Sequence, residues 1–356
     1  KHLARVRLSL FANMSMKAVV VQEYGDSSKL SYEDVPIPEP GPGEVLVYVP
    51  LPRKHISLVI YVPLSRKHIS LVTCVPLPGK HKSLLICVPR PWETHITSDM
   101  CSPTQETHIP SDMSLKFAVF YITDAYAQYS KVATKYAVKV PDSLSMEQAA
   151  STLWQGFTAH AFACSSYPIK AGDKILVHAA AGGVGSLIVQ IAKNAGAFVI
   201  GTTSTEAKAA KAKDSGADEV ILYSQKDFVE EVNRITDGKG VNVIYDGVGK
   251  TTFLKNFDCL ARRGTVVVYG GASGPPDPLN VGTLAKGSSY VTFGHFLHFV
   301  EDPAEYKQRA NELFSWLAEG KLKFSGGITV VPLADAKKAH DMLEGRHTTG
   351  KVLLQP

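Results

Sequence analysis

The clearest pattern of hydrophobic and polar positions lies in residues 174–202. A short apolar run at 175–177 has the length of a strand, and a second one follows at 198–200. Between them, apolar residues recur at helical spacing on one face: Leu187, Ile188, Ile191, Ala192 and Ala195. Gly196 then ends the helix. The pattern predicts a strand, a helix and a second strand, which together form a βαβ unit.

Strand-length and helical patterns continue to alternate after this unit. Further strands are predicted at 220–222, 243–245, 265–269 and 290–293. Helices are predicted at 227–236 and near 251–261. This alternation predicts an α/β fold with a doubly wound parallel sheet. A long helix from 302–303 to 318 follows, and the last predicted elements are a strand at 328–331, a helix at 334–343 and a strand at 351–354.

The region before the βαβ unit has fewer regular patterns. Strands are predicted at 18–21 and 45–47, and a proline-rich segment joins them. Residues 125–153 predict two strands and then a helix with its cap region at Ser143–Ser145. Glu147 and Gln148 lie in the first turn of this helix, as a capping box requires.

Residues 48–113 consist of five related copies of a 13-residue segment, one of them 14 residues long. The first two copies agree at 11 of 13 positions, including positions that would face opposite sides of a strand. Selection for packing would preserve one face and release the other. We therefore interpret the segment as a translated tandem repeat rather than an evolved structural module.

The repeats also contain residue types that bind zinc. Each copy has a histidine, and the last three copies begin with Cys74, Cys87 and Cys101. Six or seven residues separate each of these cysteines from the next histidine, whereas zinc sites are usually preorganised by closer pairs. The spacing predicts no metal site.

Composition and charge limit the class of protein. The hydrophobic content of 45% and the charged content of 20% are ordinary for a globular protein, and the net charge of +5 is scattered, which argues against a nucleic-acid partner. No apolar run has the length of a membrane span. Five cysteines without a framework pattern favour a reducing compartment, which predicts a cytoplasmic protein.

Residues 1–15 are basic and contain no acidic residue. This composition is compatible with part of a mitochondrial transit peptide or with translated leader sequence, with Met14 or Met16 as the start. Both interpretations stay open, and the first would make the location mitochondrial.

The turn inside the βαβ unit has the spacing Ala180-x-Gly182-x-x-Gly185. Glycines let the backbone turn sharply and approach a pyrophosphate, and the helix that follows offers free N–H groups. A tight strand–helix turn without a ligand is the alternative. Within a βαβ unit the pattern predicts a dinucleotide site formed by Ala180, Ala181, Gly182, Gly183, Val184 and Gly185.

The end of the second strand predicts which dinucleotide binds. Enzymes that use NAD usually have an acidic residue there for the ribose hydroxyls, but no acid precedes Glu206. Ser204 and Lys208 offer a hydroxyl group and a cation, which suit a 2′-phosphate. Glu206 as the acid, with Lys208 in solvent, remains the alternative. The pattern favours NADPH.

Several segments together resemble one enzyme family. They are MKAVVVQEYG (16–25), GPGEVLV (41–47), AYAQYS (125–130), QGFTAH (155–160), VHAAAGGVG (177–185), YDGVGK (245–250), KGS (286–288) and TTGKVLL (348–354). The chain resembles the zinc-independent NADPH:quinone oxidoreductases of the zeta-crystallin type, in the medium-chain dehydrogenase/reductase superfamily. The resemblance implies metal-free hydride transfer from NADPH to a quinone or related electrophilic carbonyl. It also implies a homodimer formed through the edge strand near 290–293.

The resemblance implies a GroES-like catalytic domain around a central Rossmann domain. We expect an extension at 1–15, the start of the catalytic domain at 16–47, the repeats and their junction at 48–124, more of the catalytic domain at 125–153, the NADPH-binding Rossmann domain at 154–292, and a return to the catalytic domain at 293–356.

Site residues are implied by position in the matching motifs. Thr158 would lie near the nicotinamide, and the turn 180–185 would hold the pyrophosphate. Ser204, Lys208 and Tyr223 would surround the adenosine phosphate, which Arg346 would also contact. Four further residues would lie at strand ends next to the cofactor: Gly247, Val248, Gly270 and Gly271.

The chain departs from the family in two places. The repeats replace the segment with the family's Gly-Val-Asn stretch and several barrel strands, and Phe293-Gly294 replaces an Arg-Pro pair. No catalytic side chain can therefore be assigned. We expect 48–124 to pack loosely and the chain to reduce quinones weakly or not at all. A non-enzymatic NADPH-binding protein and an interaction protein that uses the basic repeats are the two alternatives.

Overall fold

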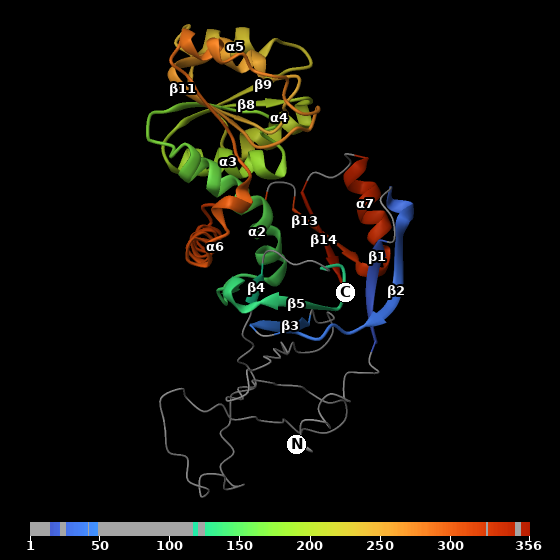
Figure 1. Cartoon of the computed structure of the whole chain (residues 1–356). Helices are drawn as coiled ribbons and strands as arrows, with labels where there is room; N and C mark the ends of the chain where they lie inside the picture. The colour runs from blue at the N-terminus through green and yellow to red at the C-terminus, as the bar shows by residue number, and fades with distance from the viewer. Residues whose placement is uncertain are drawn as a thin grey trace, which may run out of the picture. The chain divides into compact units, whose positions relative to one another are not determined.

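A computed structural model describes residues 15–21, 26–41, 43–48, 117–119, 125–324, 327–345 and 350–356 (Figure 1). The chain forms two compact units. Unit 1 comprises residues 1–142, 330–346 and 353–356, and unit 2 comprises 143–329 and 347–352. The predicted extension at 1–15 and the repeats at 48–113 lie outside the described residues, except for Ser15 and Tyr48.

Unit 2 contains a six-stranded sheet in which all neighbouring strands are parallel. The strand order is β12-β11-β10-β7-β8-β9, so the chain reverses its direction of winding between β7 and β10. The strands are β7 (Lys174–Val177), β8 (Phe198–Thr203), β9 (Glu219–Leu222), β10 (Val241–Asp246), β11 (Leu260–Val268) and β12 (Tyr290–Phe293). The predicted parallel α/β sheet is confirmed.

Helices connect these strands, and local caps determine where they begin. Ser145 forms the predicted capping box: its hydroxyl accepts from the Gln148 N–H at 3.1 Å, and its own N–H donates to the Gln148 side-chain oxygen at 2.8 Å. Thr205, Asp227 and Asp302 cap three later helices. The helices of unit 2 are α2 (Met146–His160), the π-helical turn η4 (Ala161–Ser166), α3 (Gly183–Asn194), α4 (Glu206–Asp214), α5 (Phe228–Ile235), η5 (Leu254–Asp258), η6 (Val281–Lys286), η7 (Phe296–Phe299) and α6 (Pro303–Ala318).

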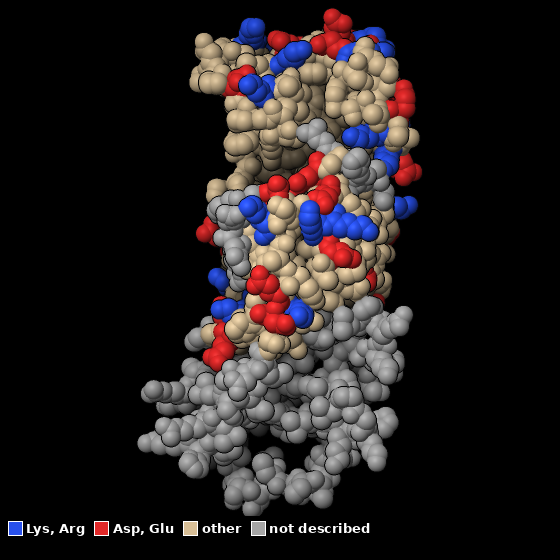
Figure 2. Space-filling view, turned by 90° about the vertical axis from the view of Figure 1, so that its right-hand side faces the viewer, with Lys and Arg blue, Asp and Glu red and all other residues tan. Residues whose placement is uncertain are grey.

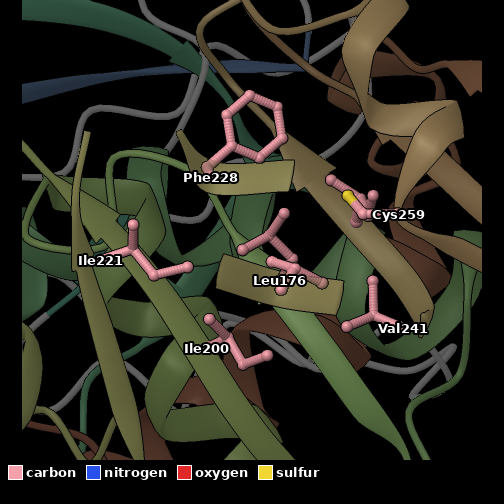
Figure 3. Packing of buried hydrophobic residues seen from close by; sticks show 8 residues of the cluster. Leu176, Ile200, Ile221, Phe228, Val241 and Cys259 are labelled. Atoms are coloured by element: carbon pink, nitrogen blue, oxygen red, sulfur yellow. The ribbon is translucent and has the colours of Figure 1, made fainter. Parts of the chain in front are cut away.

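Buried apolar side chains between the sheet and its helices form the core of unit 2 (Figure 3). Leu176 and Ile200 are fully buried at the centre of adjacent strands, which explains why these strands are continuous apolar runs. The cluster comprises Leu176, Ile200, Ile221, Phe228, Val232, Val241, Ile244 and Cys259.

Unit 1 is built from small antiparallel pairs. Strand β1 (Ser15–Val21) pairs with β2 (Leu30–Pro36), β3 (Glu44–Tyr48) with β5 (Tyr129–Ala133), and β4 (Phe117–Val119) with β6 (Ala137–Lys139). A further pair joins β13 (Ile328–Pro332) and β14 (Lys351–Gln355). The remaining elements are η1 (Ser27–Lys29), η3 (Thr134–Tyr136), η8 (Leu333–Asp335) and α7 (Ala336–Glu344).

The predicted helix near 251–261 is wrong. Only the short 3₁₀ helix η5 forms there, and Leu260 already belongs to β11, opposite Val241 of β10. The Val241 N–H donates to the Cys259 carbonyl at 3.0 Å. Pairing with a neighbouring strand therefore overrides the local helical pattern.

Candidate functional site

The turn between β7 and α3 is held by backbone hydrogen bonds. Ala179 adopts a left-handed conformation with φ 51°, and the Gly182 N–H donates to its carbonyl at 2.8 Å. The Ala180 N–H donates to the Thr202 carbonyl of β8 at 3.1 Å. The turn therefore lies at the carboxyl ends of β7 and β8, and β7 borders the point where the winding direction reverses.

Glycine is required inside this turn because other backbone atoms approach closely. A Cβ atom on Gly185 would lie 2.4 Å from the Ala179 carbonyl oxygen, and one on Gly201 would lie 2.7 Å from the Ala180 Cβ. The first N–H groups of α3 have no acceptor within the helix, and its N-terminus is the positive end of the helix dipole. This geometry fits a pyrophosphate.

Helix α2 borders the same turn, and sequence analysis missed the residue that contacts it. The Gln155 amide lies beside Gly183, where an added Cβ would be 2.3 Å from its nitrogen. Thr158 lies one helical turn further on, is buried, and donates a hydrogen bond to the Trp154 carbonyl at 3.0 Å. The QGFTAH motif contains both Gln155 and Thr158, so the motif itself is the signal for the two residues.

Ser204, Lys208 and Tyr223 gather after β8 and β9. The Tyr223 N–H donates to the Thr203 carbonyl at 3.1 Å, and the Ser224 hydroxyl donates to the Ser204 carbonyl at 3.0 Å. Tyr223 is 54% exposed, and Lys208 is exposed in the first turn of α4. Glu206 is exposed in the same turn, so the carboxylate and the amine are both near the strand end.

A buried hydroxyl group lies next to these residues. The Thr203 side chain is 2% exposed, and its oxygen has no hydrogen-bond partner in the described part of the chain. A buried polar group without a partner costs free energy unless a ligand or water satisfies it. The orphaned oxygen fits a polar ligand at this strand end, which sequence analysis did not identify.

The loops after β10 and β11 are bonded to each other. The Ser273 N–H donates to the Val248 carbonyl at 2.9 Å, and the Ala272 N–H donates to that of Gly247 at 3.2 Å. A Cβ on Gly270 would lie 2.7 Å from the Gly247 oxygen, so the two backbones touch. Gly271 lies in the same tight loop, beside the Gly274 carbonyl.

A buried polar network connects these strand ends. The Asp246 carboxylate accepts hydrogen bonds from the N–H groups of Val248 and Gly249 and from Thr252 and Asn256, at 2.7 to 3.0 Å. The other amide atom of Asn256, Oδ1, lies 2.8 Å from His178 Nε2. Asp246, Asn256 and His178 are all buried.

The network fixes the tautomer of His178. Because Asn256 donates to Asp246 through Nδ2, its Oδ1 must accept from His178 Nε2–H. Nδ1 then accepts from the Thr202 hydroxyl at 3.0 Å. Burial lowers the pKa of His178, which favours this neutral form. The neutral imidazole thus connects β7, β8 and η5 beneath the turn.

Apart from Thr158, which lies near the C-terminal end of α2, the described candidate residues, including Ala181 and Val184 of the turn, lie on loops and helix starts at the carboxyl ends of β7 to β11. Arg346 lies outside the described residues.

Within the described ranges, no group of three or more His, Cys, Asp or Glu side chains could hold a metal ion. No helix among them is long and apolar enough to cross a membrane. Acidic and basic side chains are interspersed on the face in Figure 2.

A parallel sheet with a glycine turn at the point where its winding reverses defines a dinucleotide-binding protein of the Rossmann class. Comparisons with known proteins narrow this class. The zinc-binding dehydrogenase family matches residues 183–316. A quinone oxidoreductase of Salmonella typhimurium is 42% identical over 234 residues, which are 65% of this chain and 72% of that protein.

Solved structures agree with these matches. A mycobacterial protein complexed with NADPH is 34% identical, with a TM-score of 0.74 over 96% of this chain and 100% of its own. The Escherichia coli quinone oxidoreductase complexed with NADPH is 29% identical, with a TM-score of 0.75 and the same coverage. The chain belongs to the quinone oxidoreductase family, in the zinc-independent branch of the medium-chain dehydrogenases/reductases.

Proposed function

We propose that the chain binds NADPH and reduces a quinone or related electrophilic carbonyl without a metal. Bound NADPH supplies a hydride, which carries two electrons to the acceptor, and a proton from solvent completes the hydroquinone. The observation that carries the proposal is the turn 180–185, which requires glycine at position 185 and presents the N-terminus of α3. NADPH in two related structures supports the choice of cofactor.

Each candidate residue has a proposed role. The turn residues hold the pyrophosphate, and Ser204, Lys208 and Tyr223 hold the adenosine phosphate. Thr158 and the loops with Gly247, Val248, Gly270 and Gly271 lie beside the nicotinamide half. The close backbone contact between Gly247 and Gly270 supports this role, because it keeps side chains away from the strand ends.

The preference for NADPH is tested at Lys208. Because an ammonium group that pairs with the 2′-phosphate has no counterpart in NADH, Lys208→Gln should raise the Kd for NADPH about tenfold and leave that for NADH unchanged. Lys211→Gln removes the same charge three residues later and serves as the control. An equal effect of Lys208→Gln on both cofactors would contradict the assignment.

The reaction is tested by following the loss of NADPH absorbance with the full chain and an ortho-quinone. Slow, quinone-dependent oxidation of NADPH is the expected result. Saturable NADPH binding without any oxidation would contradict the proposed reaction and leave a non-enzymatic NADPH-binding protein.

We also propose a homodimer formed through β12, a cytoplasmic location, and a GroES-like role for unit 1. Strand β12 is an edge strand of the sheet, and its Tyr290 and Phe293 are 60% and 70% exposed. Such an apolar edge favours pairing with a second strand. In sedimentation velocity the chain should behave as a dimer and Tyr290→Glu as a monomer, whereas a monomeric parent chain would contradict the proposal.

A further inference from the structure

The segment Phe293–Phe299 is rich in aromatic side chains that the cofactor site leaves without a role. Phe296 in η7 packs edge-on against Trp154 of α2, with 5.1 Å between ring centroids and an interplanar angle of 65°. The ring of His295 stacks on the same Phe296 ring, with 5.7 Å between ring centroids and an interplanar angle of 15°. Three rings therefore form one continuous surface.

Two of these rings face solvent. Trp154 is 56% exposed, although tryptophan is usually largely buried, and His295 is exposed as well. Phe296 beneath them is buried. An indole on a packed aromatic base is a preorganised surface for a flat apolar ligand, since little conformational freedom remains to be lost on binding.

The surface adjoins the cofactor residues. Trp154 directly precedes Gln155, which lies beside Gly183 of the turn. The Trp154 carbonyl accepts the hydrogen bond of the Thr158 hydroxyl. The same helical turn of α2 therefore contacts the pyrophosphate turn and carries the exposed indole.

The other end of the surface is anchored to the sheet. The Gly294 N–H donates to the Val268 carbonyl of β11 at 3.1 Å. A Cβ on Gly294 would lie 2.4 Å from the Phe162 ring, which itself stacks on Tyr269 at 5.6 Å. Only glycine at position 294 lets the aromatic segment pack this closely.

We propose that Trp154, His295 and Phe296 bind the acceptor, and that they select planar quinones with several fused rings. The acceptor stacks on the Trp154 indole, and the exposed imidazole of His295 offers an N–H to a quinone oxygen. This inference rests on the proposed function, because it assigns the acceptor side of the same reaction.

The test compares phenanthrenequinone, with three fused rings, and para-benzoquinone, with one. Trp154→Ala keeps the backbone carbonyl that Thr158 requires. It should raise the KM for phenanthrenequinone about tenfold, as expected for a lost aromatic stack, and should change the KM for benzoquinone and the Kd for NADPH by less than about twofold. Trp154→Phe should recover most of the loss. Leu343→Ala, which removes an exposed side chain of α7, is the control.

A binding measurement separates this inference from the proposed function. The chain has three tryptophans, so Trp92→Phe with Trp316→Phe leaves Trp154 as the sole indole. With NADP⁺ bound, no hydride is available, and phenanthrenequinone should still quench Trp154 fluorescence saturably. Quenching without turnover of NADPH would support the surface and contradict the reaction. Turnover with unchanged kinetics in Trp154→Ala, or turnover without quenching, would overturn the inference and leave the reaction standing.

Discussion

The βαβ segment β7–α3–β8 of unit 2 and the β3–β5 pair of unit 1 differ in how far apart in sequence their pairing strands lie. In unit 2, β7 and β8 are consecutive strands joined by a single helix, and the sheet grows in both directions from them. In unit 1, Val47 of β3 pairs with Ser130 of β5, and Ala18 bridges to Ala127. Closing such long loops costs more conformational entropy than closing a βαβ unit. The β7–α3–β8 segment of unit 2 is therefore specified locally, whereas the β3–β5 pair and the Ala18–Ala127 bridge of unit 1 depend on distant segments.

The largest effect should come from the turn that defines unit 2. Gly185→Val places its Cβ against the Ala179 carbonyl, which belongs to the backbone and cannot move aside. We expect NADPH affinity to fall by about a hundredfold or more, since the pyrophosphate turn must open. Titration by nicotinamide fluorescence measures this loss.

Gly183→Ala is the matched control in the same turn. Its Cβ would meet the Gln155 amide, the end of a flexible side chain, so the loss of affinity should be much smaller. Equal losses for the two variants would show that backbone approach does not decide the binding.

This contrast also shows why one half of the molecule was predictable. The elements at 174–202 were predicted correctly as β7, α3 and β8, because spacing, glycines and the final Gly196 are all local signals. The capping box of α2 was confirmed for the same reason. The predicted glycine and polar site residues that the structure describes lie together because parallel strands end at one edge of the sheet.

Other features had no local signal. His178 and Asn256 are 78 residues apart, and neither periodicity nor motif spacing indicates that their side chains meet. Likewise, no local signal indicated that Leu260 pairs with Val241 of β10, so a helix was predicted where the structure has the start of β11. The Trp154–Phe296 contact joins two elements whose packing the sequence does not specify.

The next largest effect should come from the buried network that these long-range contacts create. Asp246→Ala leaves four buried or half-buried donors without their acceptor. We expect the free energy of unfolding to fall by about 3 kcal/mol, measured by urea denaturation. Asp227→Ala removes the exposed cap of α5 and an exposed ion pair with Lys255, and it should cost about 1 kcal/mol. A loss at Asp246 no larger than at Asp227 would contradict a structural role for the network.

A smaller effect should appear on acidification. Burial lowers the pKa of both His178 and His160. At His160, the hydrogen bond to Glu312 opposes this shift, and the nearby Arg309 guanidinium adds to it. Below about pH 6.5 the unfolded chain therefore binds protons that the folded chain does not, and stability decreases. We expect stability to be lost progressively between pH 7 and about pH 5.5.

Thermal unfolding of the parent chain and of His178→Gln at both pH values measures this effect. Glutamine cannot be protonated in this range but can still donate to Asn256, so the variant should show a shallower pH dependence. An identical slope in both proteins would mean that His178 is not buried in its neutral form.

The central claim is that unit 2 of this chain binds NADPH at the turn 180–185. Its most direct test is a titration of the full chain with NADPH and, separately, with NADH, followed by nicotinamide fluorescence. We predict saturable binding of both cofactors, with NADPH bound at least about tenfold more tightly. Failure of NADPH to bind, or an equal affinity for NADH, would contradict the account.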